Sequence, residues 1–137
     1  MAPLKADNVT HIVIHCTDTP EGRHTTVADV DAWHRQRGWA CIGYHYLIGL
    51  NGEIWEGRPL RYQGAHARGY NGVSIGICYV GGKRGGKPAD TRTPMQKLAL
   101  TELVARLRRQ FPKVTHVVGH RDLDPRKQCP CYDVTRE

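Results

Sequence analysis

The feature that most constrains the fold of this chain is a nearly continuous apolar run, Ser74 to Val80 (SIGICYV). A strand with one face in water alternates apolar and polar side chains, whereas an uninterrupted apolar run is typical of a strand covered on both faces. Such a strand needs a layer of structure on each side of its sheet. The run therefore favours an α/β architecture in which a central sheet lies between helices.

Four other segments have the composition of strands, and two of them are joined by a turn signal. Asn51-Gly52 predicts a two-residue hairpin turn, which makes the strands on either side antiparallel neighbours. A hairpin in a chain that also contains helices favours a sheet of mixed direction. The four predicted strands are Thr10–Cys16, Tyr44–Leu50, Glu53–Glu56 and Val114–Gly119.

Two helices are predicted, over Val27–Arg37 and over Pro94–Gln110. Thr93 is the expected N-cap of the second helix, Pro94 takes its first position, and Gln96 completes a capping box. Its apolar stripe is predicted to comprise Met95, Leu98, Val104, Leu107 and Phe111, with Leu103 at the edge. A length of 137 residues suffices for one core, so we expect a single α/β domain over 1–137, a mixed sheet flanked by helices.

The net charge of +7 raises the question of a polyanionic partner. Basic residues cluster at Lys83–Lys87 and Arg106–Arg109, but without the aromatic interleaving of a nucleic-acid module, so we expect no nucleic-acid partner. No stretch approaches the ~18 apolar residues of a membrane span, and Met1–Asn8 lacks the apolar core of a signal peptide. We expect a monomer made in the cytoplasm that reaches any extracellular target only after release.

Five cysteines are an odd number, and without a signal peptide a disulfide framework is not expected. Cys16, Cys41 and Cys78 lie in apolar surroundings and are predicted to be buried. Cys129 and Cys131 lie in a polar loop, an environment that suits a thiolate acting as a metal ligand or as a nucleophile.

Two histidines end predicted strands, and strands of mixed sheets collect sites at their ends. His15 ends the first strand, His120 follows the last, and Cys129 comes nine positions later. Two imidazoles and a thiolate would hold a catalytic zinc ion with one position left open. Spacing alone leaves open the alternative that neither histidine binds a metal, and that each is either hydrogen-bonded within the protein or exposed to solvent.

Strand alternation assigns the faces of these residues. His15 shares a face with His11 and Val13, whereas Cys16 packs inward with Ile12 and Ile14. Tyr44 and Tyr46 are predicted to share a face opposite His45. His116 is expected at the surface or behind the ligands, and His24 and His34 are expected to be exposed.

Five sequence blocks carry a resemblance to a known family. They occur in the order IVIHCTDT, RQRGWACIGYHYLIGLNGEIWEGRP, GAHARGYNGVSIGICYVGG, TPMQKLAL and GHRDLDPRKQCPCYD, and they span residues 10 to 133. Together they resemble the zinc-dependent N-acetylmuramoyl-L-alanine amidases, including bacteriophage members, which share their fold with peptidoglycan recognition proteins. The resemblance implies a hydrolase that cleaves the amide between N-acetylmuramic acid and L-alanine in the cell wall.

The resemblance also implies residue roles. His15, His120 and Cys129 correspond to the family's zinc ligands, and Tyr44 and Lys127 to its catalytic residues. His66 and Asn71 correspond to positions along its substrate groove. The chain departs from the phage pattern at Cys131, where a small residue would be expected and where a second thiol could compete for the metal.

Zinc would activate a water molecule, Lys127 could donate to the oxyanion, and Tyr44 could contact the water or the carbonyl oxygen. No carboxylate is an obvious general base. Three alternatives stay open: a non-catalytic peptidoglycan-binding module, a cytoplasmic amidase that recycles muropeptides, and a regulatory protein that binds another macromolecule. A lytic enzyme of phage or prophage origin is the main expectation.

Overall fold

The computed structural model describes all residues from 1 to 137, and its centre is a five-stranded sheet with the order β4-β3-β5-β1-β8. Strands β3, β5, β1 and β8 are parallel, and only the edge strand β4 is antiparallel to its neighbour. The mixed direction confirms the expectation from the sequence. The bounds are β1 His11–Cys16, β3 Tyr46–Ile48, β4 Ile54–Glu56, β5 Ser74–Tyr79 and β8 His116–Gly119.

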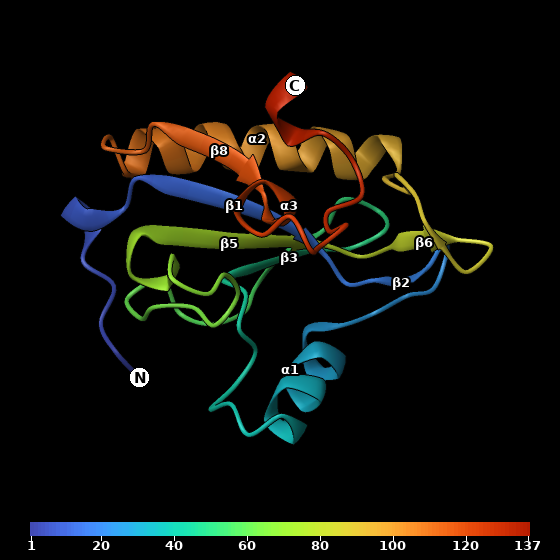
Figure 1. The fold of residues 1–137 in the computed structure, drawn as a ribbon, viewed down its shortest axis with the longest axis horizontal. Coiled ribbons are helices and arrows are strands. Elements are labelled where there is room, and N and C mark those ends of the chain that lie inside the picture. The colour runs from blue at the N-terminus through green and yellow to red at the C-terminus, as the bar shows by residue number, and fades with distance from the viewer.

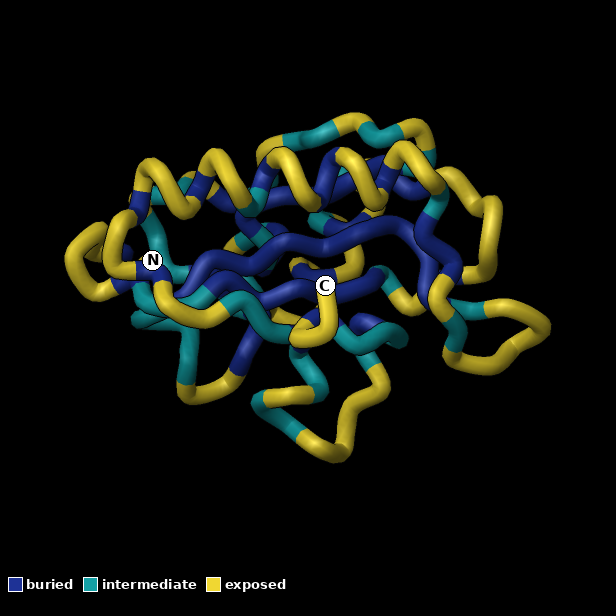
Figure 2. Tube along the Cα trace, turned by 90° about the horizontal axis from the view of Figure 1, so that it is seen from above, coloured by how far each residue is buried: buried dark blue, intermediate teal, exposed yellow.

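Strand β5 lies in the middle of the sheet and every one of its residues is buried. Helix α2 (Pro94–Gln110) covers one face of the sheet and helix α1 (Val27–Gln36) lies on the other side, as Figure 1 shows. In Figure 2 the strands form the buried layer, whereas the loops around them are exposed. The apolar run that predicted a doubly covered strand is thus confirmed.

Helix α2 has the predicted bounds and the predicted capping box, but its buried face is different. Leu103 is fully buried in the main core, whereas Met95 and Leu98 are 53% and 65% exposed. The buried face of α2 was predicted from apolar residues alone, and the prediction was wrong because that face begins at a polar residue, Gln96. The Gln96 side chain is fully buried, where its Nε2 donates to the carbonyl oxygens of Ile48 and Val80.

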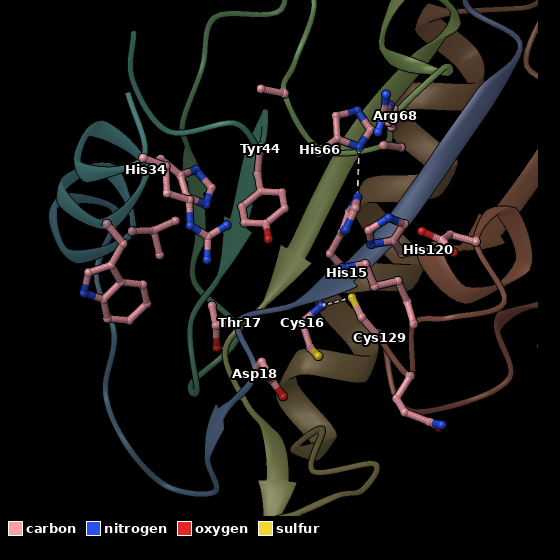
Figure 3. Close-up of a pocket in the computed structure, with 18 of the residues that line it drawn as sticks. His15, Cys16, Thr17, Asp18, His34, Tyr44, His66, Arg68, His120 and Cys129 are labelled. Carbon is pink, nitrogen blue, oxygen red and sulfur yellow. Dashed lines mark hydrogen bonds between the residues drawn. The ribbon is translucent and has the colours of Figure 1, made fainter. Parts of the chain in front are cut away.

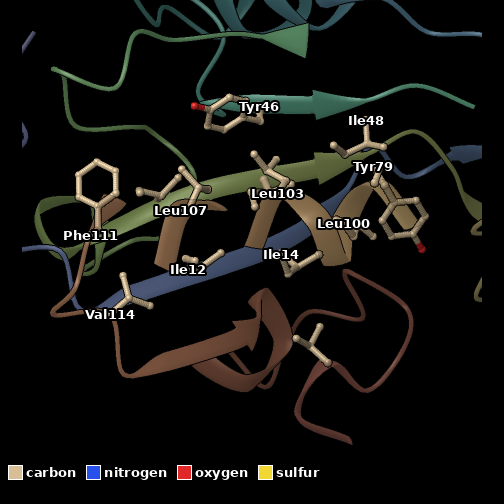
Figure 4. Close-up of a cluster of buried hydrophobic side chains, with 14 of the residues drawn as sticks. Ile12, Ile14, Tyr46, Ile48, Tyr79, Leu100, Leu103, Leu107, Phe111 and Val114 are labelled. Carbon is tan, nitrogen blue, oxygen red and sulfur yellow. The ribbon is translucent and has the colours of Figure 1, made fainter. Parts of the chain in front are cut away.

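The core between α2 and the sheet collects side chains of one parity from each strand (Figure 4). Ile12, Ile14 and Cys16 of β1 belong to it, as alternation predicted. A smaller core on the opposite face contains Val30 of α1 together with Leu47 and Cys78. The side chains of the main core that Figure 4 labels are Ile12, Ile14, Tyr46, Ile48, Tyr79, Leu100, Leu103, Leu107, Phe111 and Val114.

The β3–β4 hairpin is present, but its turn is longer than the predicted two residues. Ile48 pairs with Ile54, and the Gly49 amide donates to the Glu53 carbonyl at 2.8 Å. Gly52 has a φ of +82°, a conformation that glycine adopts without the cost of a Cβ. The strong turn signal therefore located the turn correctly but not its length.

Several short elements were not predicted. A second sheet with the order β2-β6-β7 extends beside the main one, and a one-turn helix, α3 (His120–Leu123), follows β8 directly. No helix of the structure combines the length and the apolar character needed to cross a membrane. The remaining elements are β2 Thr19–Pro20, β6 Gly82–Arg84, β7 Lys87–Pro88 and the 3-10 helices η1 Ala6–Asn8, η2 Asn71–Val73 and η3 Val134–Arg136.

Candidate metal centre

Three potential ligands meet at the carboxyl end of the parallel strands (Figure 3). His15 is the penultimate residue of β1, and His120 opens α3 immediately after β8, the neighbour of β1 in the sheet. Cys129 reaches the same edge from the loop after α3. One donor atom from each of the three residues lies within 4.8 Å of the others. The structure thus brings together the three residues that the sequence predicted as a cluster.

The loop that carries Cys129 is held from three sides. The Arg121 amide donates to the Cys129 carbonyl at 2.8 Å, and the Tyr79 hydroxyl donates to the Pro130 carbonyl at 2.6 Å. The Cys16 amide donates to the Cys129 sulfur at 3.2 Å. The sulfur therefore already accepts a hydrogen bond from the backbone, which fixes its position at the edge of the sheet.

Both imidazoles of the cluster favour the neutral form, the form that binds a metal ion. Burial lowers the pKa of His15 well below its usual value, and the neighbouring His66, His120 and His34 add to the effect. Burial also lowers the pKa of His120, helped by the charge of Lys127. At neutral pH each ring can therefore offer one unprotonated nitrogen.

Cys131 does not belong to the cluster. Its sulfur lies 3.8 Å from that of Cys16, and burial, with the neighbouring Cys16, raises the pKa of the Cys131 thiol to about 12. A thiol at neutral pH is a poor metal ligand. Cys16 and Cys78 are buried as predicted, whereas Cys41 is only partly buried, because it lies in the irregular segment before β3 and not in a strand.

The cluster opens into a groove with a volume of about 970 Å³. In Figure 3, Tyr44 lies between His34 of α1 and His15, and His15 in turn lies beside His120. Five cationic side chains line it against two acidic ones, and both acids have ion-pair partners. The cations are Arg37, Arg68, Lys83, Arg126 and Lys127, and the acids are Asp18 and Asp124. The groove therefore suits a ligand with negative charge.

Tyr44 lies beside His15, with their ring centroids 5.0 Å apart, but on the opposite face from Tyr46. The predicted shared face is wrong because regular alternation starts only at Tyr46, where β3 begins, and the backbone before it is irregular. Burial raises the pKa of Tyr44 well above its usual value, so its hydroxyl keeps its proton. The phenol is therefore a hydrogen-bond donor at neutral pH.

The other predicted site residues also line the groove. Lys127 is exposed, in the loop that precedes Cys129. Asn71 accepts hydrogen bonds at its Oδ1 from the amides of His66 and Ala67, both at 3.0 Å. His66 is buried, and burial lowers its pKa well below the usual value.

Two groove residues were not anticipated from the sequence. His34 was expected to be exposed but is 5% exposed, because it follows the buried Val30 by one helical turn and its Nδ1 accepts from the Gly43 amide at 2.8 Å. Trp39 packs at 4.6 Å from it, centroid to centroid. The i, i+4 spacing of Val30 and His34 was the available signal. The exposure of His24 and His116 is as predicted.

Solved structures with this fold define a class that contains both amidases and peptidoglycan recognition proteins. One is the amidase LysC from Clostridium intestinale, with a TM-score of 0.80, 32% identity and coverage of 96% of this chain and 83% of that one. Another is peptidoglycan recognition protein LE in complex with tracheal cytotoxin, a monomeric diaminopimelic acid-type peptidoglycan. Its TM-score is 0.74 at 28% identity, with 93% of this chain and 76% of that one covered.

The chain belongs to the N-acetylmuramoyl-L-alanine amidase family, whose model matches residues 5–132. Among sequence relatives, the endolysin of Enterobacteria phage K11 is 35% identical over 133 residues, which cover 96% of this chain and 87% of that protein. The chain is accordingly a hydrolase of peptidoglycan that cleaves the amide between N-acetylmuramic acid and L-alanine. The fold class and the activity implied by the sequence blocks are confirmed.

Proposed function

We propose that this amidase works with a zinc ion held by His15, His120 and Cys129. The observation that carries the proposal is the convergence of their donor atoms, within 4.8 Å of one another, at the groove. Two neutral imidazoles and a sulfur that accepts a backbone hydrogen bond make a donor set that suits zinc, and three protein ligands are typical of catalytic sites. Bound zinc supplies Lewis acidity, which activates a water nucleophile and polarises a carbonyl group.

Two side chains of the groove complement this chemistry. The Tyr44 hydroxyl, which remains protonated, donates a hydrogen bond to the scissile carbonyl as negative charge develops on its oxygen. Lys127 supplies a positive charge from the rim of the groove. Neither role needs a carboxylate base, and the two groove carboxylates, Asp18 and Asp124, already have cationic partners.

The substrate that we propose is the cell-wall polymer itself, reached after release from the cell. Support comes from the relatives that are named endolysins and from the size and charge of the groove, since stem peptides carry carboxylates. Asn71 lines the groove, and the two hydrogen bonds that its Oδ1 accepts fix its side chain there, which suits a substrate contact through Nδ2. We further propose that the chain acts as one domain and as a monomer.

Product analysis tests this function. Zinc-loaded protein is expected to clear suspensions of bacterial walls and to release free amino groups, with mass spectrometry locating the new termini at the lactyl and L-alanine positions. New reducing sugars in place of amino groups would contradict the proposal. Parallel digests of intact sacculi and soluble muropeptides distinguish a lytic enzyme, which attacks both, from a recycling amidase, which attacks only the fragments. Binding to sacculi without any product would indicate a non-catalytic module.

Tyr44→Phe is expected to lower the turnover number about 10²- to 10³-fold while zinc content stays unchanged, because it removes one donor to the developing oxyanion and no metal ligand. Lys127→Ala is expected to act in the same direction. Turnover and zinc content are measured on the same preparations. Tyr46→Phe is the matched control, because Tyr46 lies on the α2 side of the sheet. Loss of zinc in Tyr44→Phe would show that the tyrosine role is misassigned.

A further inference from the structure

A chain of hydrogen bonds runs away from the metal centre into the protein. His15 Nε2 lies 2.8 Å from His66 Nδ1, and His66 Nε2 lies 3.2 Å from Ser74 Oγ. The Ser74 hydroxyl in turn donates to the Tyr70 carbonyl at 2.7 Å. His15, His66 and Ser74 are 1%, 8% and 0% exposed, so water does not compete for these contacts.

The Tyr70 carbonyl, at the end of this series of hydrogen bonds, determines which group donates in each of them. The carbonyl of Tyr70 can only accept, so the single hydroxyl proton of Ser74 is used there. Ser74 Oγ must then accept from His66, which places the hydrogen of the neutral His66 ring on Nε2. His66 Nδ1 is left as an acceptor, and His15 must donate to it from Nε2.

We propose that His66 and Ser74 are positioning residues that hold His15 in the tautomer with its hydrogen on Nε2. The unprotonated Nδ1 of His15 then faces the metal. The proposal rests on the proposed function in that His15 is a zinc ligand. An outer partner that fixes the tautomer and the orientation of a ligating histidine raises the affinity of the site, because no free energy is spent on reorganising the ring.

Two glycines, one on either side of His66 in the sequence, leave the space that the His66 ring occupies. A Cβ atom at Gly76 would lie 2.7 Å from His66 Cγ, and one at Gly64 would lie 2.5 Å from His66 Cδ2. Gly76 interrupts the otherwise apolar run of β5. Glycine weakens the interior of a strand, and it often marks a place where another group approaches the backbone closely. The approaching group is the imidazole of His66.

The ring nitrogens of His66 are not available to bind substrate, because both already have partners within the protein. One nitrogen contacts His15 and the other contacts Ser74, while the backbone amide of His66 is bound by Asn71. His45 provides a matched comparison, because it is also buried and its ring centroid lies 5.9 Å from that of His66. Its nitrogens instead contact the Gly76 amide and the Tyr62 carbonyl, and none contacts His15.

The test combines zinc retention with a direct reading of the tautomer, both on the full-length chain. Competition with a chromophoric chelator measures zinc retention. We expect the zinc affinity to fall about 10- to 100-fold in Ser74→Ala and in His66→Leu. In Ser74→Thr and in His66→Asn, which keep an acceptor at the altered position, we expect most of the affinity to be retained. His45→Gln is expected to retain zinc like the unaltered chain.

Nitrogen-15 NMR of the imidazole rings shows which nitrogen of His15 carries hydrogen. We expect hydrogen on Nε2 in the unaltered chain, with and without zinc, and a mixture of tautomers in zinc-free Ser74→Ala, a small change that keeps the core intact. Hydrogen on His15 Nδ1 in the zinc-free chain, or undiminished zinc retention in both Ser74→Ala and His66→Leu, would overturn the proposal. If the unaltered chain does not retain zinc, the proposed function fails, and the spectra still decide the tautomer.

Discussion

Cys129→Ala is expected to release zinc from the protein and to lower the rate of amide cleavage by at least about a thousandfold. Removing one of the three proposed ligands would leave two imidazoles, too few for a stable catalytic site. The Lewis acidity that a bound zinc ion would supply is worth several kcal/mol of transition-state stabilisation, and about 4 kcal/mol corresponds to a factor of about a thousand. The change should barely affect the core, since Cys129 lies at its edge.

Zinc content by mass spectrometry and amino-group release from sacculi measure the two effects. Cys131→Ser is the matched control, because its sulfur is also in the loop but contacts Cys16 and not the ligand cluster. This control is expected to keep both zinc and activity. If Cys129→Ala retained zinc and the double variant with Cys129→Ala and Cys131→Ser lost it, Cys131 would be the third ligand and the proposed site would be wrong.

Leu103→Ala is expected to lower the free energy of unfolding by about 3–5 kcal/mol, a large part of the about 5–15 kcal/mol typical of a native protein. Leu103 is fully buried in the core between α2 and the sheet (Figure 4), so truncation leaves a cavity that its neighbours cannot fill. Urea denaturation followed by circular dichroism measures the change.

Leu98→Ala on the same helix makes the matched control. Leu98 is 65% exposed, so this substitution is expected to change stability by less than about 0.5 kcal/mol. The pair therefore tests which face of α2 is buried. Equal costs for the two variants would contradict the arrangement of α2 on the sheet.

Local signals in the sequence were sufficient for much of the fold. The capping box of Thr93 and Gln96 located the start of α2, because both of its hydrogen bonds join residues three positions apart. The apolar run of β5 likewise predicted that both faces of the strand are covered, because consecutive side chains point to opposite faces and all of them are apolar or small. The ends of strands were less well predicted: the expected Tyr44–Leu50 strand shrinks to β3, Tyr46–Ile48.

The candidate site was anticipated in part. His15, His120 and Cys129 were recognised because each lies in a sequence block that resembles a family, and the structure brings them to one point. The side of the sheet on which Tyr44 lies was not predictable from alternation, because the backbone before β3 is irregular. The burial of His34 was missed because a polar residue on the buried side of a helix gives no apolar signal.

The buried face of α2 and the setting of His15 were decided only by the tertiary structure. Gln96 belongs to the core because two carbonyl oxygens, of Ile48 and Val80, lie within reach of its amide. His66 contacts His15, although 51 positions separate them, because β5, which follows His66, pairs with β1; Ser74 of β5 contacts His66 from behind. The sequence by itself determined the main elements, the doubly covered strand and the three residues of the candidate cluster. Contacts between distant segments decided which polar groups are buried, because a buried polar group is stable only where a partner from elsewhere in the chain meets it.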